Sequence, residues 1–210
     1  MLKKSNIKLK RLFLFLSIYL LSFYQLFSQD ISYSDPYSEK LLFSPAYSGL
    51  SSCSEINLSY NKKYISDYYS ASFNKFLQKY NSGVGFIISE NRQGKGAINN
   101  LNIDLIYSYK ITLNKRSIIN TALQASYLQQ NINSNKLIFN NQINPVTGNI
   151  SSNSYETSFN SYNGTDFSIA TTYISTKYRA GIVINHIDKI LYEPELYKIT
   201  PSFKFHFAKE

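Results

Sequence analysis

The stretch Asn100–Ile111 constrains the fold more than any other part of the sequence. Its residues alternate with a period of two: every odd-numbered position from Leu101 to Ile111 is apolar or aromatic, and the even-numbered positions are mostly polar. Side chains on a β-strand point to opposite faces in turn, so this stretch is predicted to be one strand. Soluble strands average about five or six residues, whereas a tilted strand that crosses a bilayer needs about 9–11. The length therefore fits a membrane-crossing strand, and a long half-buried strand of a soluble sandwich is the alternative.

The first 28 residues have the layout of a secretory signal peptide. An apolar run over Leu12–Phe27 follows a basic start, and Ser28 supplies a small residue at the cleavage site. We predict that residues 1–28 are removed on export, and an uncleaved anchor helix is the alternative. Loss of the five early cations lowers the formal net charge from +9 to +4, and the remaining Lys and Arg are scattered, which argues against nucleic-acid binding. The five cations are Lys3, Lys4, Lys8, Lys10 and Arg11.

Seven further segments after residue 50 show the same alternation, and no amphipathic helical run accompanies them. This pattern indicates the all-β class. With the export signal, it predicts an antiparallel up-and-down transmembrane β-barrel over residues 51–210, with about eight strands in this chain that close by themselves or form part of a larger barrel. A soluble exported β-sandwich is the alternative. The seven segments are Glu55–Tyr60, Tyr69–Phe73, Gly83–Ser89, Ser117–Leu128, Asp166–Tyr173, Tyr178–Asn185 and Ser202–Phe207.

The connections between the predicted strands are expected to alternate between long and short. Outer-membrane barrels have short periplasmic turns and longer external loops, so the long connections are predicted to face outward. The expected long connections are Asn61–Asp67, Glu90–Asn99, Gln129–Gly164 and Ile187–Glu195. The expected short ones lie around Gln78–Ser82, Asn114–Lys115 and Ser175–Lys177.

The face of each strand opposite the apolar one is predicted to line the barrel interior. Its polar and small side chains can bond with one another or with water, and eight strands enclose an interior that side chains fill, which leaves no wide pore. The predicted inner residues are Asn102, Asp104, Ser108, Asn120, Gln124, Ser168, Arg179 and Asn185.

The chain offers few residues for catalysis or metal binding. His186 and His206 are its two histidines and Cys53 is its single cysteine, and they show no ligand spacing. We therefore predict no catalytic residues, no metal site, no cofactor and a non-enzymatic function. Cys53 is interpreted as a structural thiol, with intermolecular pairing as the alternative.

Two segments outside the strands are candidates for contacts with the barrel or with partners. Residues 29–50 combine apolar residues with prolines and a glycine, and they are predicted to pack against the barrel as an N-terminal plug or turn; a direct partner contact is the alternative. The loop 129–164 is rich in Asn and Ser and contains an apolar triplet, Leu137, Ile138 and Phe139. The triplet is a candidate partner contact, and a plain surface loop is the alternative.

An ordered set of short motifs runs along the mature chain. It begins with Asp35 and Pro36, continues with Ser44, Pro45, Ala46, Tyr47 and Gly49, and then includes Ser82–Gly85, Leu137–Asn140 and Ala180–His186. The set resembles the PorP/SprF family of the type IX secretion and gliding machinery of Bacteroidota, whose opening runs Asp-Pro, a spacer and Asn-Pro-Ala-Tyr-Ala-Gly. Here Ser44 replaces the Asn and Ser48 the second Ala. Members often carry a Trp where this chain has Tyr64, and they are usually longer, so a short or truncated member is expected.

The resemblance implies an outer-membrane protein with a surface role and no chemistry of its own. It implies contacts with outer-membrane lipid, with a secreted adhesin-type client and with periplasmic type IX secretion components. The function expected from it is support of the secretion or surface anchoring of that adhesin. A small porin or a barrel that binds hydrophobic ligands is the alternative.

Overall fold

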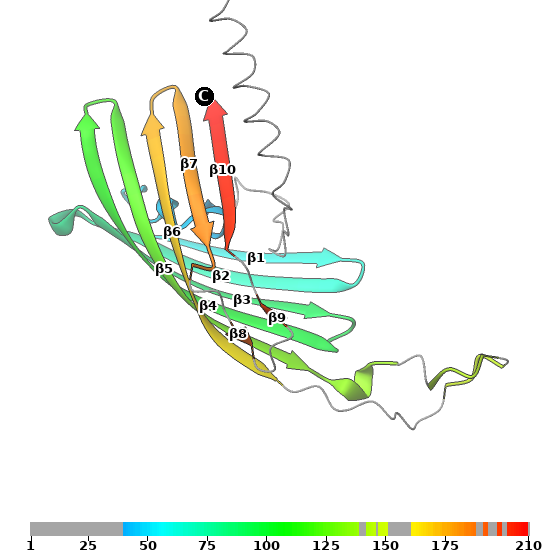
Figure 1. Cartoon of the computed structure of the whole chain (residues 1–210). Helices are drawn as coiled ribbons and strands as arrows, with labels where there is room; N and C mark the ends of the chain where they lie inside the picture. The colour runs from blue at the N-terminus through cyan, green and yellow to red at the C-terminus, as the bar shows by residue number, and fades with distance from the viewer. Residues whose placement is uncertain are drawn as a thin grey trace, which may run out of the picture. The chain divides into compact units, whose positions relative to one another are not determined.

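Backbone hydrogen bonds join the alternating segments into one antiparallel sheet (Figure 1). The computed structural model describes residues 40–138, 142–145, 147–150, 161–187, 191–192, 197–198 and 201–209. The chain divides into units over Met1–Ile31 and Ser32–Glu210, and every described residue belongs to the second. The predicted signal peptide and the motif residues Asp35 and Pro36 therefore lie outside the described residues.

Eight strands follow one another in space in the same order as in the sequence, and each pairs antiparallel with the next. This confirms the predicted all-β class and up-and-down order. The strands are β1 (Glu55–Lys63), β2 (Ser66–Leu77), β3 (Ser82–Gln93), β4 (Ile98–Asn114), β5 (Ser117–Ile132), β6 (Tyr162–Ser175), β7 (Tyr178–Asn185) and β10 (Ser202–Lys209).

The sheet is curved like part of a barrel wall, and β1 and β10 form its two edges (Figure 1). Among the described residues the two edge strands do not pair with each other. A separate two-stranded hairpin, β8 (Leu191–Tyr192) with β9 (Tyr197–Lys198), lies within the connection from β7 to β10.

The predicted alternation of loop lengths is wrong for two connections. Only Tyr64 and Ile65 separate β1 from β2, and Gly94–Ala97 is the whole connection between β3 and β4. The strands extend further than predicted because hydrophobic alternation fades near their ends while backbone pairing continues. Lys62, for example, lies opposite Asp67 in the last part of the β1–β2 ladder. The connections after β5 and β7 are long, as predicted.

The segment before β1 forms two short helical turns, α2 (Lys40–Phe43) and the 3₁₀ turn η1 (Pro45–Tyr47). Ser44 is extended and its hydroxyl accepts a hydrogen bond from the Ala46 N–H, and Pro45 occupies the first position of η1. A side-chain acceptor followed by proline is a common way to begin a helical turn. Further 3₁₀ turns, η2 (Gln78–Tyr80) and η3 (Ser134–Lys136), follow β2 and β5.

Candidate functional site: the polar inner face and its docked segment

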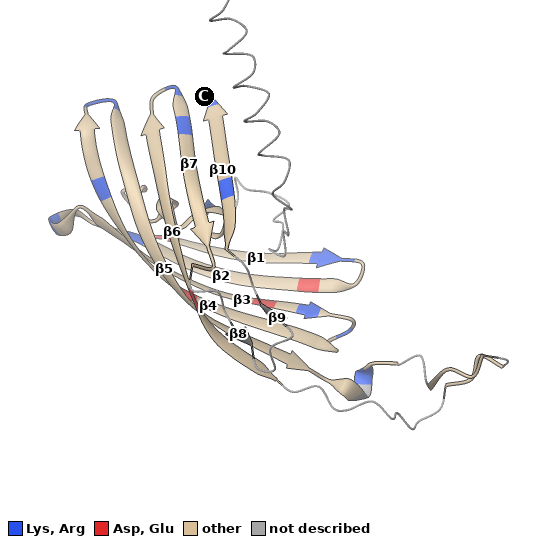
Figure 2. Ribbon diagram, viewed as in Figure 1, with Lys and Arg blue, Asp and Glu red and all other residues tan. Residues whose placement is uncertain are grey.

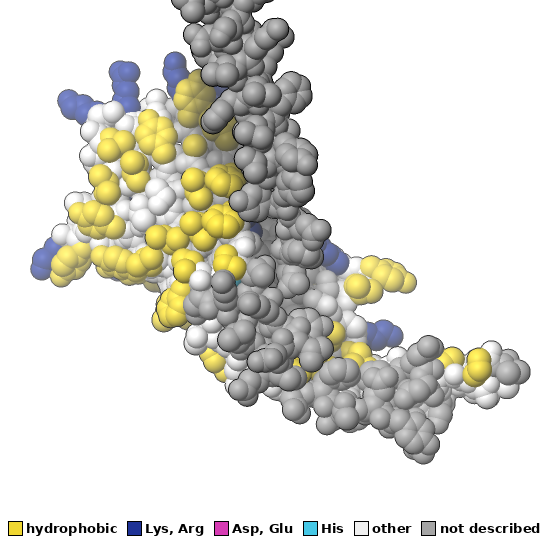
Figure 3. All heavy atoms as spheres, in the orientation of Figure 1, with side chains coloured by type: hydrophobic (Ala, Val, Ile, Leu, Met, Phe, Trp, Pro, Cys, Tyr) yellow, Lys and Arg dark blue, Asp and Glu magenta, His cyan; other side chains and the backbone are white. Residues whose placement is uncertain are grey.

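The sheet carries apolar side chains on its outer face, whereas its inner face carries polar side chains around a small apolar cluster that includes Ile87, Ile106 and Val183. On β4, Leu105 is 62% exposed, whereas its neighbours Asp104 and Ile106 are 2% and 4% exposed. Among the described residues, fifteen of the buried side chains are polar or charged and eight are hydrophobic. This is the reverse of a water-soluble protein, in which buried side chains are mainly apolar. Figure 3 shows hydrophobic side chains spread over the strand surface that faces the viewer.

Residues Lys40–Gly49, which we call the docked segment, lie on the inner face. Ser44, Ala46 and Ser48 have no exposed surface. The Asn120 amide on β5 donates to the carbonyl oxygens of Ala46 and Ser48, both at 2.8 Å. A hydroxyl on β4 adds a third bond, from Ser108 Oγ to the Ser48 carbonyl at 2.7 Å. Two strand side chains therefore satisfy backbone groups that the short turns leave without a partner.

The end of the docked segment is held by β2. The Gly49 N–H donates to Asn74 Oδ1 at 2.8 Å, and Ser48 Oγ lies 3.4 Å from the same oxygen. The Asn74 amide in turn donates to Glu55 Oε2 at 3.2 Å. Asn74 is 6% exposed, so it is a buried amide whose oxygen and nitrogen both have partners.

Two glycines allow the backbone of the docked segment to touch the backbone of β3. Gly49 has a φ of +68°, and a Cβ on Gly49 would collide with the backbone of Gly83. A Cβ on Gly83 would collide with Gly49 and with Ser108 Oγ. Any side chain at either position would push the docked segment away from the sheet.

Aromatic contacts join the docked segment to β10, at the far edge of the sheet. The ring of His206 lies 5.3 Å from that of Phe43, edge to face, and 5.8 Å from that of Tyr47. His206 Nε2 is 3.4 Å from Thr172 Oγ1 on β6. Gly181 on β7 makes room for the imidazole, because a Cβ there would collide with it. The docked segment thus contacts strands from β2 to β10.

A second polar cluster lies further along the inner face. The Asn102 amide donates to both oxygens of Asp104 at 3.0 Å, and His186 Nδ1 lies 2.8 Å from Asp166 Oδ2. Ser126 is the cross-strand neighbour of both aspartates. Within the described ranges no group of three or more His, Cys, Asp or Glu side chains is placed to hold a metal ion.

The family described as type IX secretion system membrane protein PorP/SprF matches residues 25–206. The chain belongs to the PorP/SprF family. No curated protein matches the chain. Of the helices among the described residues, none has the length and hydrophobicity needed to cross a membrane.

In this PorP/SprF member, the motif residues Ser44, Pro45, Ala46, Tyr47 and Gly49 all belong to the docked segment. The replacement of the family's Asn by Ser44 keeps a side-chain acceptor at the start of η1. The inner residues Ser108 and Asn120, predicted only to line the interior, are direct partners of the motif.

The second candidate group lies on a different element. Leu137 and Ile138 directly follow η3, and the Leu137 N–H donates to the Ser134 carbonyl at 3.0 Å. Ile138 is 59% exposed. Phe139 lies outside the described residues, so a partner role of this triplet stays a prediction.

Sequence reasoning missed Asn74 and Gly83 as partners of the motif. The sequence contained a signal for each of them. Asn74 is an amide that follows Ser70 and Ser72 on one face of a strand, and Gly83 is a glycine inside a strand, which often marks a close approach of another backbone.

Proposed function

We propose that this PorP/SprF protein is a non-enzymatic outer-membrane barrel component that supports the secretion or surface anchoring of an adhesin-type client by the type IX secretion system. Membership of the family supports the link to the type IX secretion system. The exposed apolar face of the sheet, together with its many buried polar side chains, supports the placement in a membrane. A surface of exposed Leu, Ile, Phe and Tyr is stable next to lipid and unfavourable in water.

The membrane placement also requires the sheet edges to be paired. No water is present in the hydrocarbon core to bond free N–H and C=O groups, so sheets span membranes only when closed. The outer-face residues of the edge strands are unusually open: Leu58 on β1 is 79% exposed and Phe205 on β10 is 73% exposed. In the membrane these strands pair with each other or with further strands.

The docked segment favours a scaffold over an open pore. It covers part of the inner face, where its backbone is held by Asn120, Ser108 and Asn74, and the backbone contact of Gly49 with Gly83 leaves no gap there. We propose that it is a fixed plug. The long connection between β5 and β6 is then the part of the protein that reaches the client on the outside.

The proposal is tested by deleting the gene in its own host and restoring it. The deletion strain should lose protease-accessible adhesin from intact cells while other signal-peptide proteins still reach the periplasm, and the restored gene should recover display. The protein itself should be found in outer-membrane fractions and change gel mobility on boiling. Recovery as a soluble periplasmic protein, or unchanged adhesin display in the deletion strain, would contradict the proposal.

A bilayer conductance measurement separates the scaffold from the porin alternative. The purified protein should give no steady ion current in a planar bilayer. A steady current that is insensitive to changes in the docked segment would favour the porin.

A further inference from the structure

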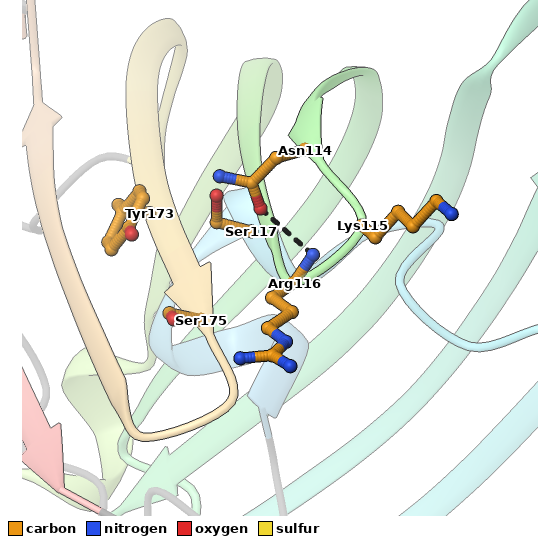
Figure 4. Close-up of a pocket in the computed structure, with 6 residues that line it drawn as sticks. All are labelled: Asn114, Lys115, Arg116, Ser117, Tyr173 and Ser175. Atoms are coloured by element: carbon orange, nitrogen blue, oxygen red, sulfur yellow. Dashed lines mark hydrogen bonds between the residues drawn. The ribbon is translucent and has the colours of Figure 1, made fainter.

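A shallow hollow of about 370 Å³ opens where the β4–β5 turn meets the end of β6. None of its lining residues belongs to the docked segment, and it lies at the end of the sheet that carries the β2–β3, β4–β5 and β6–β7 turns. Its lining consists of two cations, two hydroxyls, one amide and one phenol ring, from Lys115, Arg116, Ser117, Ser175, Asn114 and Tyr173 (Figure 4). Apart from the ring, every lining group is a cation or a hydrogen-bonding polar group.

The hollow is held in shape by the turn and by strand pairing. The Arg116 N–H donates to Asn114 Oδ1 at 2.9 Å, which fixes the turn. Ser117 lies directly opposite Ser175 on the neighbouring strand. In Figure 4 the Arg116 side chain extends toward the β6 end that carries Ser175, whereas Lys115 points away. Arg116 is therefore the main cation of the hollow.

Neither cation is neutralised by a carboxylate within the described part of the chain. The opposite end of the sheet differs, since there Arg92 pairs with Glu90 at 2.8 Å. Figure 2 shows Lys and Arg, without Asp or Glu, at the β4–β5 and β6–β7 turns. A guanidinium without a carboxylate partner that opens onto the same hollow as two hydroxyls is a combination that binds the oxygens of a phosphate.

The position of the hollow indicates which phosphate it binds. Tyr173 is 39% exposed on the outer face, and the exposed side chains of Ile111 and Leu113 lie on β4 just before the turn. Charged groups therefore adjoin an apolar surface, in the order in which a lipid headgroup adjoins its acyl chains. We propose that this hollow binds the phosphate of an anionic membrane lipid. The proposal rests on the membrane placement proposed above.

The test uses the purified full chain in detergent, titrated with short-chain phosphatidylglycerol and, separately, with short-chain phosphatidylcholine. The readout is the midpoint temperature at which the compact gel form is lost. Phosphatidylglycerol should raise the midpoint more than phosphatidylcholine. Arg116→Gln should weaken the phosphatidylglycerol affinity about tenfold, the order of effect of one charged hydrogen bond. Arg116→Lys should retain part of it.

Lys62→Gln is the matched control, because it removes one exposed outward-facing cation at the other end of the sheet. It should leave the phosphatidylglycerol response unchanged. Equal losses in the Arg116 and Lys62 variants would show a diffuse charge effect and overturn the site. An equal response of the wild type to both lipids would overturn it too.

Two further arms identify the source of the anion. Inorganic phosphate alone should not reproduce the shift; if it does, the site is not a lipid site. An acidic peptide that binds through Arg116, in place of phosphatidylglycerol, would assign the hollow to a protein partner instead. Vesicle insertion of the wild type is scored separately, so that failure of the membrane placement is distinguishable from failure of the lipid site.

Discussion

The outer and inner faces of the sheet are specified in different ways. On the outer face, residues such as Leu105 and Phe205 are 62% and 73% exposed and have no polar group that needs a partner, so they need only be apolar. On the inner face, Asn120 and Gly83 are tied to particular atoms of the docked segment. The outer face therefore tolerates exchange among apolar residues, whereas the inner face depends on individual hydrogen bonds and on the absence of single methyl groups.

The largest effect should come from placing a charge on the outer face. Leu105→Arg should destabilise the membrane-embedded protein by about 2–4 kcal/mol if Leu105 lies near the bilayer midplane. Asn102→Arg, on the inner face of the same strand, should cost less because the new cation can reach Asp104. Urea midpoints of the two variants in vesicles give the comparison. Equal losses would mean that the two faces of β4 do not correspond to lipid and interior.

Adding a single methyl group should destabilise the protein at one glycine of the inner face much more than at another. Gly83→Ala forces the new Cβ into the backbone of Gly49 and should cost about 3 kcal/mol. Gly85→Ala is the matched control, since its Cβ meets side chains of Ile106, Ser48 and Leu41 at 3.2–3.3 Å, which can move slightly. Urea unfolding measures stability, and proteolysis measures release of the docked segment. If both variants keep the segment protected, the backbone contact at Gly49 is not essential for docking.

Removing one inner-face amide should have a smaller effect. Asn120→Leu keeps the size of the side chain and leaves the Ala46 carbonyl without its donor, at a cost of about 2 kcal/mol. Gln124→Leu is the control, because its part-buried amide donates to Ser126 Oγ, at 3.1 Å, rather than to the docked segment. The difference between the urea unfolding midpoints of the two variants measures this effect. An Asn120 variant as stable as the control would assign docking to packing alone.

The smallest effect on the barrel should come from shortening the loop between β5 and β6. Replacing residues 141–158 by a short Gly-Ser linker should change stability by no more than about 0.6 kcal/mol, because loop entropy varies slowly with length. The same change should reduce adhesin display. An epitope tag in residues 149–153 should be reached by antibody on intact cells. A tag reached only after permeabilisation would invert the proposed topology.

The sequence predicted the strands better than their ends or their partners. Alternation located all eight strands of the main sheet, because a face next to lipid and a polar inner face enforce a period of two. It failed at Asn61–Asp67, where Lys62 and Asp67 pair in an extended ladder without any apolar alternation. Polar strand ends and polar loops have the same composition, so only hydrogen bonding distinguishes them.

The partners of the docked segment were beyond pattern analysis for a different reason. Asn120 lies 74 residues from Ala46 in the sequence, and no local rule connects the two. The motif Pro45–Gly49 lies outside the predicted strands; in the structure Pro45 begins the 3₁₀ turn η1 and Gly49 has a φ of +68°. Its place on the inner face follows only from the shape that the complete sheet provides.

The separation between the docked segment and its partners sets an order of assembly. The segment precedes every strand that the structure describes, yet its hydrogen bonds go to Asn74, Ser108 and Asn120 and its aromatic contact goes to the ring of His206. Contacts between distant parts of a chain form after local ones. The segment is made first and immobilised last. Until β5 and β10 have folded, the apolar residues of the segment stay accessible to any chaperone that binds the unfolded chain. Their burial then indicates that all strands of the sheet have paired.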